Sequence, residues 1–318
     1  MVRAFKKRIV VALGGNAILR SDEKGTVEEQ LRNVEETCGR LASMITQWYQ
    51  VVITHGNGPQ VGNILIQNEA GKDRVPAMPL DVCGAESQGL IGYMIQRSLR
   101  DELLRLGKTR TVASVVTQVV VDEKDEAFRH PTKPVGPFYE KEYAEGQMKT
   151  KGEHWVEQSG KGWRKVVPSP EPLEIVEKEA ILSLIDSGII VVASGGGGIP
   201  VIRKKEGALE GVEAVIDKDL AAQRLARDIG ADILLILTDI EFVMLRFGQP
   251  DQVVLRDVSA SEVRRYQKEG HFAAGSMGPK VEAALRFVES GGDAGIITSL
   301  SSARDALKGK VGTRITTS

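Results

Sequence analysis

Apolar residues along this chain form short uninterrupted runs, and three of these runs lead directly into glycine-rich turns. The runs cover 9–13, 51–54 and 189–193, and they enter Gly14-Gly15-Asn16, His55-Gly56-Asn57-Gly58-Pro59 and Ser194-Gly195-Gly196-Gly197-Gly198. Val and Ile without polar alternation are typical of parallel strands covered on both faces. Ligands of such sheets bind beyond the carboxyl ends of the strands, where glycine lets backbone N–H groups approach an anion. One such turn alone indicates no ligand, but three together predict a site for phosphate or a similar compact anion.

Amphipathic segments alternate with the apolar runs. Thr26 and Glu29 have the spacing of a capping box, and the apolar positions that follow recur at steps of four and three: Val27, Leu31, Val34, Cys38, Leu41, Ile45 and Trp48. This stripe predicts a helix buried along one face, which completes a right-handed βαβ unit with the strand after it. The same reasoning predicts helices at about 60–70, 82–106, 171–187 and 218–229 and from near Pro279, strands at 111–121, 233–237, 294–298 and 311–315, and a hairpin within 200–217. The alternation predicts a single α/β domain over 1–318 with one continuous sheet.

Residues 122–165 break this alternation. The segment contains three prolines and six aromatic residues, which are Phe128, Phe138, Tyr139, Tyr143, Trp155 and Trp163. A structureless loop of this length is uncommon in a compact domain. The segment therefore predicts an inserted subdomain, which is either a lid or a surface excursion without a function.

Composition excludes several classes of protein. The 318 residues are 42% hydrophobic and 27% charged with a net charge of −1, which predicts no nucleic-acid partner and no anionic membrane partner. No apolar run approaches the roughly 18 residues of a membrane span, and the basic start leads into a strand rather than a signal peptide. Cys38 and Cys83 form neither a metal cluster nor a disulfide framework, which suits a reducing cytoplasm.

Three lysines are candidates for binding an anion. Lys133 lies between two prolines of the insert, Lys218 lies between Asp217 and Asp219 at a strand-to-helix junction, and Lys280 lies in the first turn of a predicted helix. A cation is unfavourable at a helix N-terminus unless an anion binds there too. Each lysine is alternatively a solvated surface charge, which is the commonest state of this residue.

Familiar nucleotide and metal motifs are missing. The chain has no G-x-x-x-x-G-K-[ST], no G-x-G-x-x-G after the first strand and no protein-kinase signature. It also lacks H-E-x-x-H and any clustered His and Cys, so no metal held by the protein is predicted. His55 lies within a glycine turn, where it contacts a ligand or, more simply, bonds to the backbone of the turn.

Seven motifs occur in the order and spacing that carbamate kinases have, and together they make the chain resemble that family from about residue 8 to 315. They are Leu13-Gly14-Gly15-Asn16-Ala17, His55–Gly62, Pro131–Gly136, Val167-Pro168-Ser169-Pro170, Gly195–Pro200, Val215–Ala221 and Gly270–Lys280. Each motif alone is a weak signal, but seven in order are specific.

The resemblance implies the amino-acid kinase fold, a three-layer αβα sandwich around a mainly parallel sheet with an inserted protruding subdomain at about 122–165. It implies phosphoryl transfer between ATP and carbamate, with carbamoyl phosphate and ADP giving ATP at the end of arginine fermentation. Carbamate or carbamoyl phosphate is expected on the N-terminal part, about 1–217, and the nucleotide on the C-terminal part, about 218–318. The resemblance also implies a cytoplasmic homodimer.

Carbamate is already an anion, so its oxygen needs no general base, and phosphoryl transfer depends mainly on positioning and charge neutralisation. We expect Lys133, Lys218 and Lys280 to stabilise the phosphoryl oxygens and Asp219 to orient these lysines. Backbone N–H groups are expected to hold carbamate and the phosphoryl group at Gly14, Gly15, Asn16, Asn57 and Gly58, with Gly196 and Gly197 lining the same cleft. The ATP or ADP that brings Mg²⁺ is expected to contact Thr238, Asp239, Met277, Gly278 and Pro279.

Two other functions stay open from the sequence. Acetylglutamate kinases carry a lysine on the first strand where this chain has Ala12, so that activity is disfavoured, but another small-carboxylate kinase of the same fold remains an alternative. A nucleotide or phosphate sensor without catalysis is the second alternative, although all three lysines are present. Residues 243–256 match no motif firmly, so the adenine contacts are not assigned.

Overall fold

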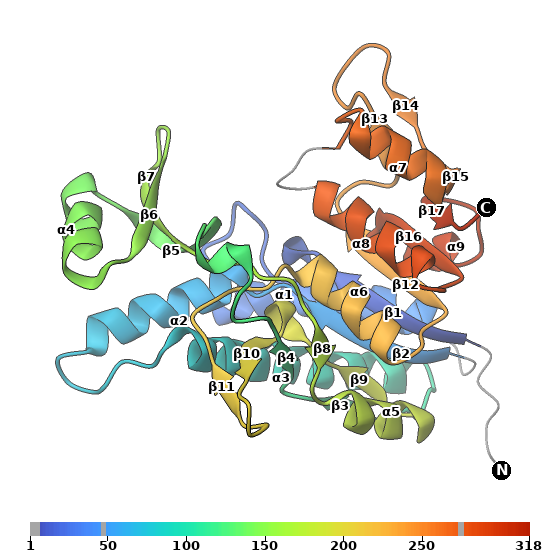
Figure 1. Ribbon diagram of the computed structural model, residues 1–318. Coiled ribbons are helices and arrows are strands. Elements are labelled where there is room, and N and C mark those ends of the chain that lie inside the picture. Colours follow the sequence, from blue (N-terminus) through green and yellow to red (C-terminus); the bar gives the residue numbers. More distant parts are fainter. Residues whose placement is uncertain (1–6, 46–48, 273–276) are drawn as a thin grey trace.

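The computed structural model describes residues 7–45, 49–272 and 277–318. Its central feature is an eight-stranded sheet with the order β15-β17-β16-β12-β1-β2-β9-β3 (Figure 1). These strands are β1 (Lys7–Leu13), β2 (Tyr49–His55), β3 (Val112–Ser114), β9 (Ile190–Val192), β12 (Ile233–Thr238), β15 (Asp257–Ser259), β16 (Ala294–Ser299) and β17 (Thr313–Thr316). All neighbours are parallel except β16 and β17.

Helices cover both faces of this sheet, as the period of two along its strands requires. Val10 and Ala12 of β1 belong to one apolar cluster, together with α5 (Lys178–Asp186), α6 (Lys218–Asp228), α7 (Ala260–Lys268) and α8 (Met277–Glu289). Ile9, Val11 and Leu13 belong to a second cluster on the other face, together with α1 (Val27–Met44), α3 (Leu80–Arg105) and α9 (Ala303–Ala306). The three-layer αβα sandwich predicted for the chain is confirmed.

The capping box at the start of α1 forms as predicted. The Thr26 hydroxyl accepts from the Glu29 N–H, and the Glu29 carboxylate accepts from the Thr26 N–H. Cys38 lies on the buried face of α1, and burial raises the pKa of its thiol. Trp48, the last residue of the predicted stripe, lies outside the described residues.

The prediction of one continuous sheet is wrong for part of the chain. A second, four-stranded sheet contains β11 (Leu209–Gly211), β10 (Ile199–Arg203), β4 (Gln118–Val120) and β8 (Glu174–Ile175). The predicted strand at 111–121 is split, because β3 pairs with β9 in the large sheet whereas β4 pairs with β10 and β8 in the second sheet. The Gln88 side chain bonds to both the N–H and the carbonyl of Thr117 between them. The helix predicted from 171 begins only at Lys178, since β8 pairs with β4 before it.

The segment predicted as an insert contains a small sheet and a helix. Strands β5 (Lys133–Tyr139), β7 (Gly162–Val167) and β6 (His154–Gln158) are antiparallel, and α4 (Lys141–Lys151) packs against β6 and β7. Tyr139 stacks on Tyr143 with ring centroids 4.5 Å apart, and Trp155 meets both rings edge-on. This unit projects from the body beside α2 (Gly58–Gly71) (Figure 1).

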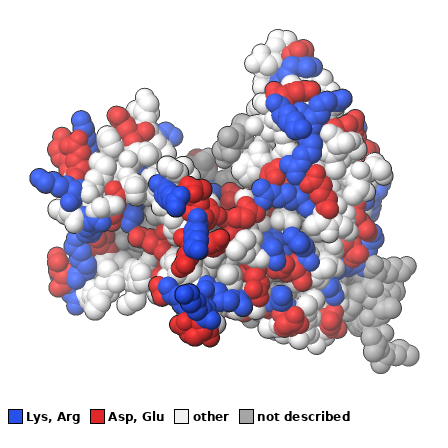
Figure 2. Space-filling model, viewed as in Figure 1, with Lys and Arg blue, Asp and Glu red and all other residues white. Residues whose placement is uncertain are grey.

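No large patch of one charge sign lies on the visible face of the described part of the molecule. Lys and Arg are intermixed there with Asp and Glu (Figure 2), in keeping with the net charge of −1. Within the part of the chain that the structure describes, no helix combines the length and apolar character that crossing a membrane requires.

Candidate active site

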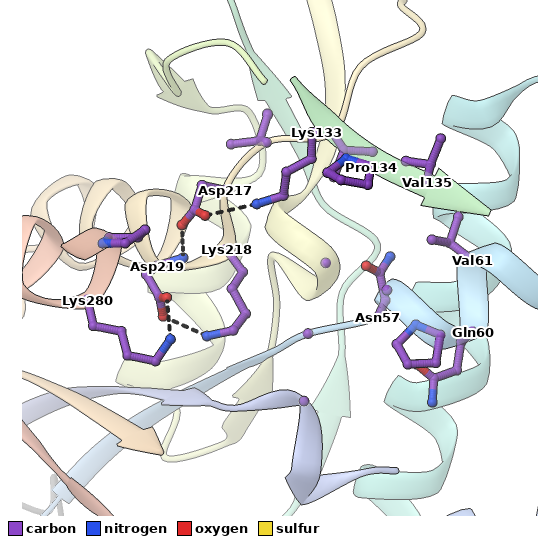
Figure 3. Close-up of a pocket in the computed structure, with 18 residues that line it drawn as sticks. Asn57, Gln60, Val61, Lys133, Pro134, Val135, Asp217, Lys218, Asp219 and Lys280 are labelled. Atoms are coloured by element: carbon purple, nitrogen blue, oxygen red, sulfur yellow. Dashed lines mark hydrogen bonds and ion pairs between the residues drawn. The ribbon is translucent and has the colours of Figure 1, made fainter. Parts of the chain in front are cut away.

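A cavity of about 340 Å³ lies at the carboxyl ends of β1, β2 and β9. Lysines and aspartates gather on one side of it, and Asn57 and Gln60 lie on the other (Figure 3). It is lined by Gly15, 56–61, 133–135, Gly196, 215–219, Pro279 and Lys280. The cavity therefore brings together all three predicted lysines and parts of all three glycine turns, as expected for a sheet of this kind.

Lys218 and Lys280 converge on one carboxylate. The Lys218 Nζ lies 2.6 Å from Asp219 Oδ1, and the Lys280 Nζ lies 3.2 Å from Asp219 Oδ2. Asp219 is only 2% exposed. The two ammonium groups come from the first turns of α6 and α8, which pack against each other. One buried carboxylate thus fixes the positions of two cations that are far apart in the sequence.

Lys133 reaches the same cavity from the insert. Its Nζ lies 3.0 Å from Asp217 Oδ2, while Asp217 Oδ1 accepts from the Asp219 N–H and caps α6. Burial would raise the pKa of the Asp217 carboxyl, but the Lys133 ammonium and the Asp219 N–H outweigh burial and keep the pKa below its ordinary value. The carboxylate is therefore ionised, and it ties the insert to the start of α6.

The α2 N-terminus forms the opposite wall. Gly58, Pro59 and Gln60 line the cavity, and Asn57 does not cap the helix with its side chain. The Asn57 amide instead donates to the Ser87 hydroxyl over 2.8 Å. A helix N-terminus without a side-chain cap presents backbone N–H groups and the positive end of the helix dipole, which favour an anion.

Three predicted binding residues lie outside this cavity. The Gly14 N–H already donates to the Leu237 carbonyl over 3.0 Å, because β1 pairs with β12 there, so the prediction that this N–H contacts substrate is not supported. Asn16 lines a separate cavity, and its amide donates to Asp239 over 2.8 Å. Gly197 is buried, and its N–H lies 3.2 Å from the Ser194 carbonyl oxygen.

His55 is the buried last residue of β2, at the start of the glycine turn, and it does not line the cavity. It is 1% exposed, and its Nδ1 lies 2.9 Å from the Gly56 carbonyl oxygen. Burial lowers the pKa of His55 to about 4, against an opposing effect of the bond to Gly56. Since a carbonyl only accepts, Nδ1 carries the proton of a neutral ring. Of the two interpretations from the sequence, the structure favours the turn residue.

A second cavity of about 590 Å³ lies where the C-terminal part of the chain gathers apolar side chains. It holds the predicted residues Thr238, Asp239 and Met277. Pro279 lines the first cavity, which we call the charged cavity for its lysines and aspartates, and Gly278 lines a third cavity beside Phe272. Sequence reasoning missed the other lining residues, which are Ile240, Met244, Arg246, Phe247, Gln249, Gly270, His271 and Phe272. Several belong to the hairpin of β13 (Met244–Leu245) and β14 (Val253–Val254), whose sequence matched no motif. The signal available in the sequence was the motif Gly270–Lys280, which contains Gly270, His271 and Phe272 but was given no role at these three residues.

The carboxylates of the charged cavity are not a ready cation site. Asp217 and Asp219 are each bonded to lysine ammonium groups. Among residues 7–45, 49–272 and 277–318, no group of three or more His, Cys, Asp or Glu has the arrangement of a metal site. This set of donors fits Mg²⁺ carried by phosphate oxygens better than Mg²⁺ held by the protein.

Comparison with known proteins places this geometry in context. Residues 7–299 match the amino acid kinase family. The chain is 53% identical to carbamate kinase of Pyrococcus horikoshii, over 98% of this chain and 99% of that protein. It is 50% identical to carbamate kinase of Trichomonas vaginalis, over 97% and 99%. The structure of carbamate kinase from Giardia lamblia bound to AMP-PNP superposes with a TM-score of 0.94 at 47% identity, over 99% of each chain.

Proposed function

Since this chain belongs to the amino acid kinase family, we propose that it is a carbamate kinase, which transfers a phosphoryl group reversibly between ATP and carbamate. Its near full-length similarity to carbamate kinases supports this function. The observation that carries the mechanism is the convergence of Lys133, Lys218 and Lys280 on one cavity at the ends of the glycine turns.

The reaction exchanges one bond for another at phosphorus. In the ATP-forming direction, the bond between phosphorus and the carbamoyl oxygen breaks and a bond to a β-phosphate oxygen of ADP forms. Carbamate leaves as an anion and breaks down to carbon dioxide and ammonia. No proton has to be removed from the nucleophile in either direction, so the chemistry needs no general base. A neutral His55 outside the cavity wall is consistent with that.

Charge stabilisation is the role that we assign to the lysines. Each ammonium group has three N–H donors, so Lys218 and Lys280 can keep their bonds to Asp219 and still donate to the transferring phosphoryl group. Asp219 then acts as the residue that orients both lysines. Fixed donors of this kind need no reorganisation as charge develops, which is the main source of catalysis at such sites.

Carbamoyl phosphate would occupy the wall formed by the glycine turns. Gly15, Asn57 and Gly58 offer backbone N–H groups there, together with the N-terminus of α2, and Gly196 lines the same space. Lys133 reaches over this space from the insert. This arrangement supports our proposal that the N-terminal part of the chain, with its inserted subdomain, binds the carbamoyl substrate.

The nucleotide would occupy the second cavity. Its apolar residues, including Ile240, Met244 and Phe247, suit a purine ring, and Thr238 and Asp239 supply polar groups at the end of β12. Met277 lines this cavity and Lys280, one helical turn later, lines the charged one, so the start of α8 connects them. The phosphates of ADP would cross there and bring Mg²⁺ with them, which would neutralise part of their charge.

Some proposals rest on the family resemblance alone. They are the cytoplasmic location, the homodimer, and ATP formation at the end of arginine fermentation as the physiological direction. Sedimentation equilibrium of the full chain tests the homodimer, because a mass of twice 34.5 kDa is expected and the monomer mass would contradict it.

A coupled assay for ATP tests the function. The full chain should form ATP from ADP and carbamoyl phosphate, and it should form little from ADP and acetyl phosphate. A preference for acetyl phosphate would favour another small-carboxylate kinase. Tight ADP binding without ATP formation from either donor would favour a sensor.

A further inference from the structure

The four-glycine turn after β9 contains more glycine than ligand contact explains. Only Gly196 among residues 195–198 lines the charged cavity. Gly196, Gly197 and Gly198 all have positive φ values, and Ser194, which is not glycine, also adopts the left-handed conformation with φ 53°. A left-handed conformation at a non-glycine residue is energetically unfavourable and persists only where its surroundings enforce it.

Buried hydrogen bonds hold the start of this turn. The Ser194 N–H donates to the Thr117 hydroxyl over 2.9 Å, and the Ser194 carbonyl accepts from the Thr54 hydroxyl over 2.8 Å. Gln88 of α3 in turn accepts from the Thr117 N–H over 2.8 Å. The turn is thus fixed to β2 and, through Thr117, to α3, and it cannot shift freely to make room for a neighbour.

The neighbours of the turn belong to both walls of the charged cavity. A Cβ atom at Gly196 would overlap the side-chain amide of Asn57, which precedes α2 on the wall formed by the N-terminus of that helix. A Cβ atom at Gly197 would overlap the carbonyl oxygen of Ile216. Ile216 directly precedes Asp217 and Lys218 on the opposite wall, which we call the lysine wall. The turn therefore lies in direct contact with both walls, and its lack of side chains sets how closely they approach.

We propose that residues 194–198 act as a spacer, in which Gly196 and Gly197 are positioning residues that set the distance between the turn at Asn57 and Lys218 at the start of α6. This inference rests on the proposed function, because it assigns the spacing to phosphoryl transfer. A displacement of about 1 Å in such a site can lower the rate about 100-fold even though no contacting group is removed.

Gly197→Ala tests the spacer at the lysine wall, with Gly207→Ala as its matched control. Gly207 has a similarly positive φ of 90°, but a Cβ atom there meets nothing within 4 Å. We expect Gly197→Ala to lower kcat for ATP formation about 100-fold and to change ADP affinity, measured by calorimetry, by less than about 3-fold. Gly207→Ala should behave as wild type. Equal kcat values for the two variants would overturn the spacer.

A double-mutant cycle tests the other wall, and it keeps the proposal falsifiable if Gly197→Ala fails to fold. The overlap at Gly196 is with a side chain, which can move. Gly196→Ala should raise the KM for carbamoyl phosphate about 10-fold in the wild-type background but less than about 2-fold in Asn57→Ala. Equal effects in both backgrounds would overturn the contact with Asn57. Failure of the wild-type chain to form ATP would reject the proposed function instead.

Discussion

The charged cavity, which holds Lys133, Lys218 and Lys280, and the second cavity, called the apolar cavity here for its apolar side chains, meet at the start of α8 but differ in their lining. The charged cavity draws on short contiguous motifs, such as 56–61, 133–135 and 215–219. The apolar cavity draws on the short stretches 238–240, 246–247 and 270–272 and on the single residues Met244, Gln249 and Met277, none of which is a lysine. Phosphoryl transfer needs charges and N–H groups at fixed points, which few sequences can supply. A purine ring needs a space of suitable shape, which many combinations of side chains can supply.

Removal of Lys280 should give the largest effect and test whether the charged cavity carries the chemistry. Lys280→Ala removes one of the two cations fixed by Asp219, so we expect turnover to fall by about 10²–10³-fold. Steady-state formation of ATP measures this. The exposed Lys205, in the turn between β10 and β11, provides the control variant Lys205→Ala. Near-native turnover in folded Lys280→Ala would refute the role of this lysine.

Removal of Lys133 should affect one substrate only. Its side chain is 36% exposed and forms one ion pair with Asp217, so its share in binding is smaller. Lys133→Ala should raise the KM for carbamoyl phosphate about 10-fold, as expected for a charged contact of about 1.5 kcal/mol. Calorimetry should show ADP binding largely kept. Weakened ADP binding with an unchanged KM for carbamoyl phosphate would reassign the insert to the nucleotide.

Removal of Phe247 from the apolar cavity should affect ADP and leave carbamoyl phosphate unaffected. Loss of an aromatic contact of about 1 kcal/mol is expected to weaken ADP binding about 5-fold, and the KM for carbamoyl phosphate should stay unchanged. Phe138 is a 40% exposed phenylalanine on the insert, outside the apolar cavity, so Phe138→Ala is the control. If both variants bind ADP as wild type does, the second cavity does not hold the base.

The smallest expected effect is that of Asp217→Asn on the stability of the fold, and this effect depends on pH. Because the pKa of Asp217 is lowered in the folded chain, its charge stabilises the fold above about pH 4, and this contribution is lost as pH falls through the lowered pKa. Asparagine can still cap α6. We expect the variant to lose about 1 kcal/mol or less at pH 7 and less again at pH 3, by urea unfolding. An equal loss at both pH values would contradict the ion pair with Lys133.

Sequence patterns predicted those parts of the fold that depend on local order. The apolar runs became β1, β2 and β9, and the capping box began α1, since each depends on neighbouring residues. The split between β3 and β4 was not predictable, because it requires knowing that β3 pairs with β9 whereas β4 pairs with β10 and β8. The bond between the Gly14 N–H and Leu237 was not predictable either, because it requires knowing that β12 pairs with β1.

The charged site shows the same distinction between what neighbouring residues determine and what the fold determines. Lys218 and Asp219 are neighbours in the sequence, but the meeting of Lys280 with Asp219 depends on how α6 packs against α8. The motifs therefore identified the charged residues, whereas their pairing required the fold. Part of the lining of the apolar cavity comes from the β13–β14 hairpin, whose sequence matched no motif.

Phosphorus NMR of the full chain with carbamoyl phosphate, ADP and Mg²⁺ tests the central claim most directly, because it follows the transferred group itself. The carbamoyl phosphate signal should decay while the γ-phosphate signal of ATP grows in equal amount. The Lys280→Ala variant should show the same exchange at a rate lower by about 10²–10³-fold. Release of inorganic phosphate without ATP, or no change beyond the decay seen without protein, would contradict phosphoryl transfer between these substrates.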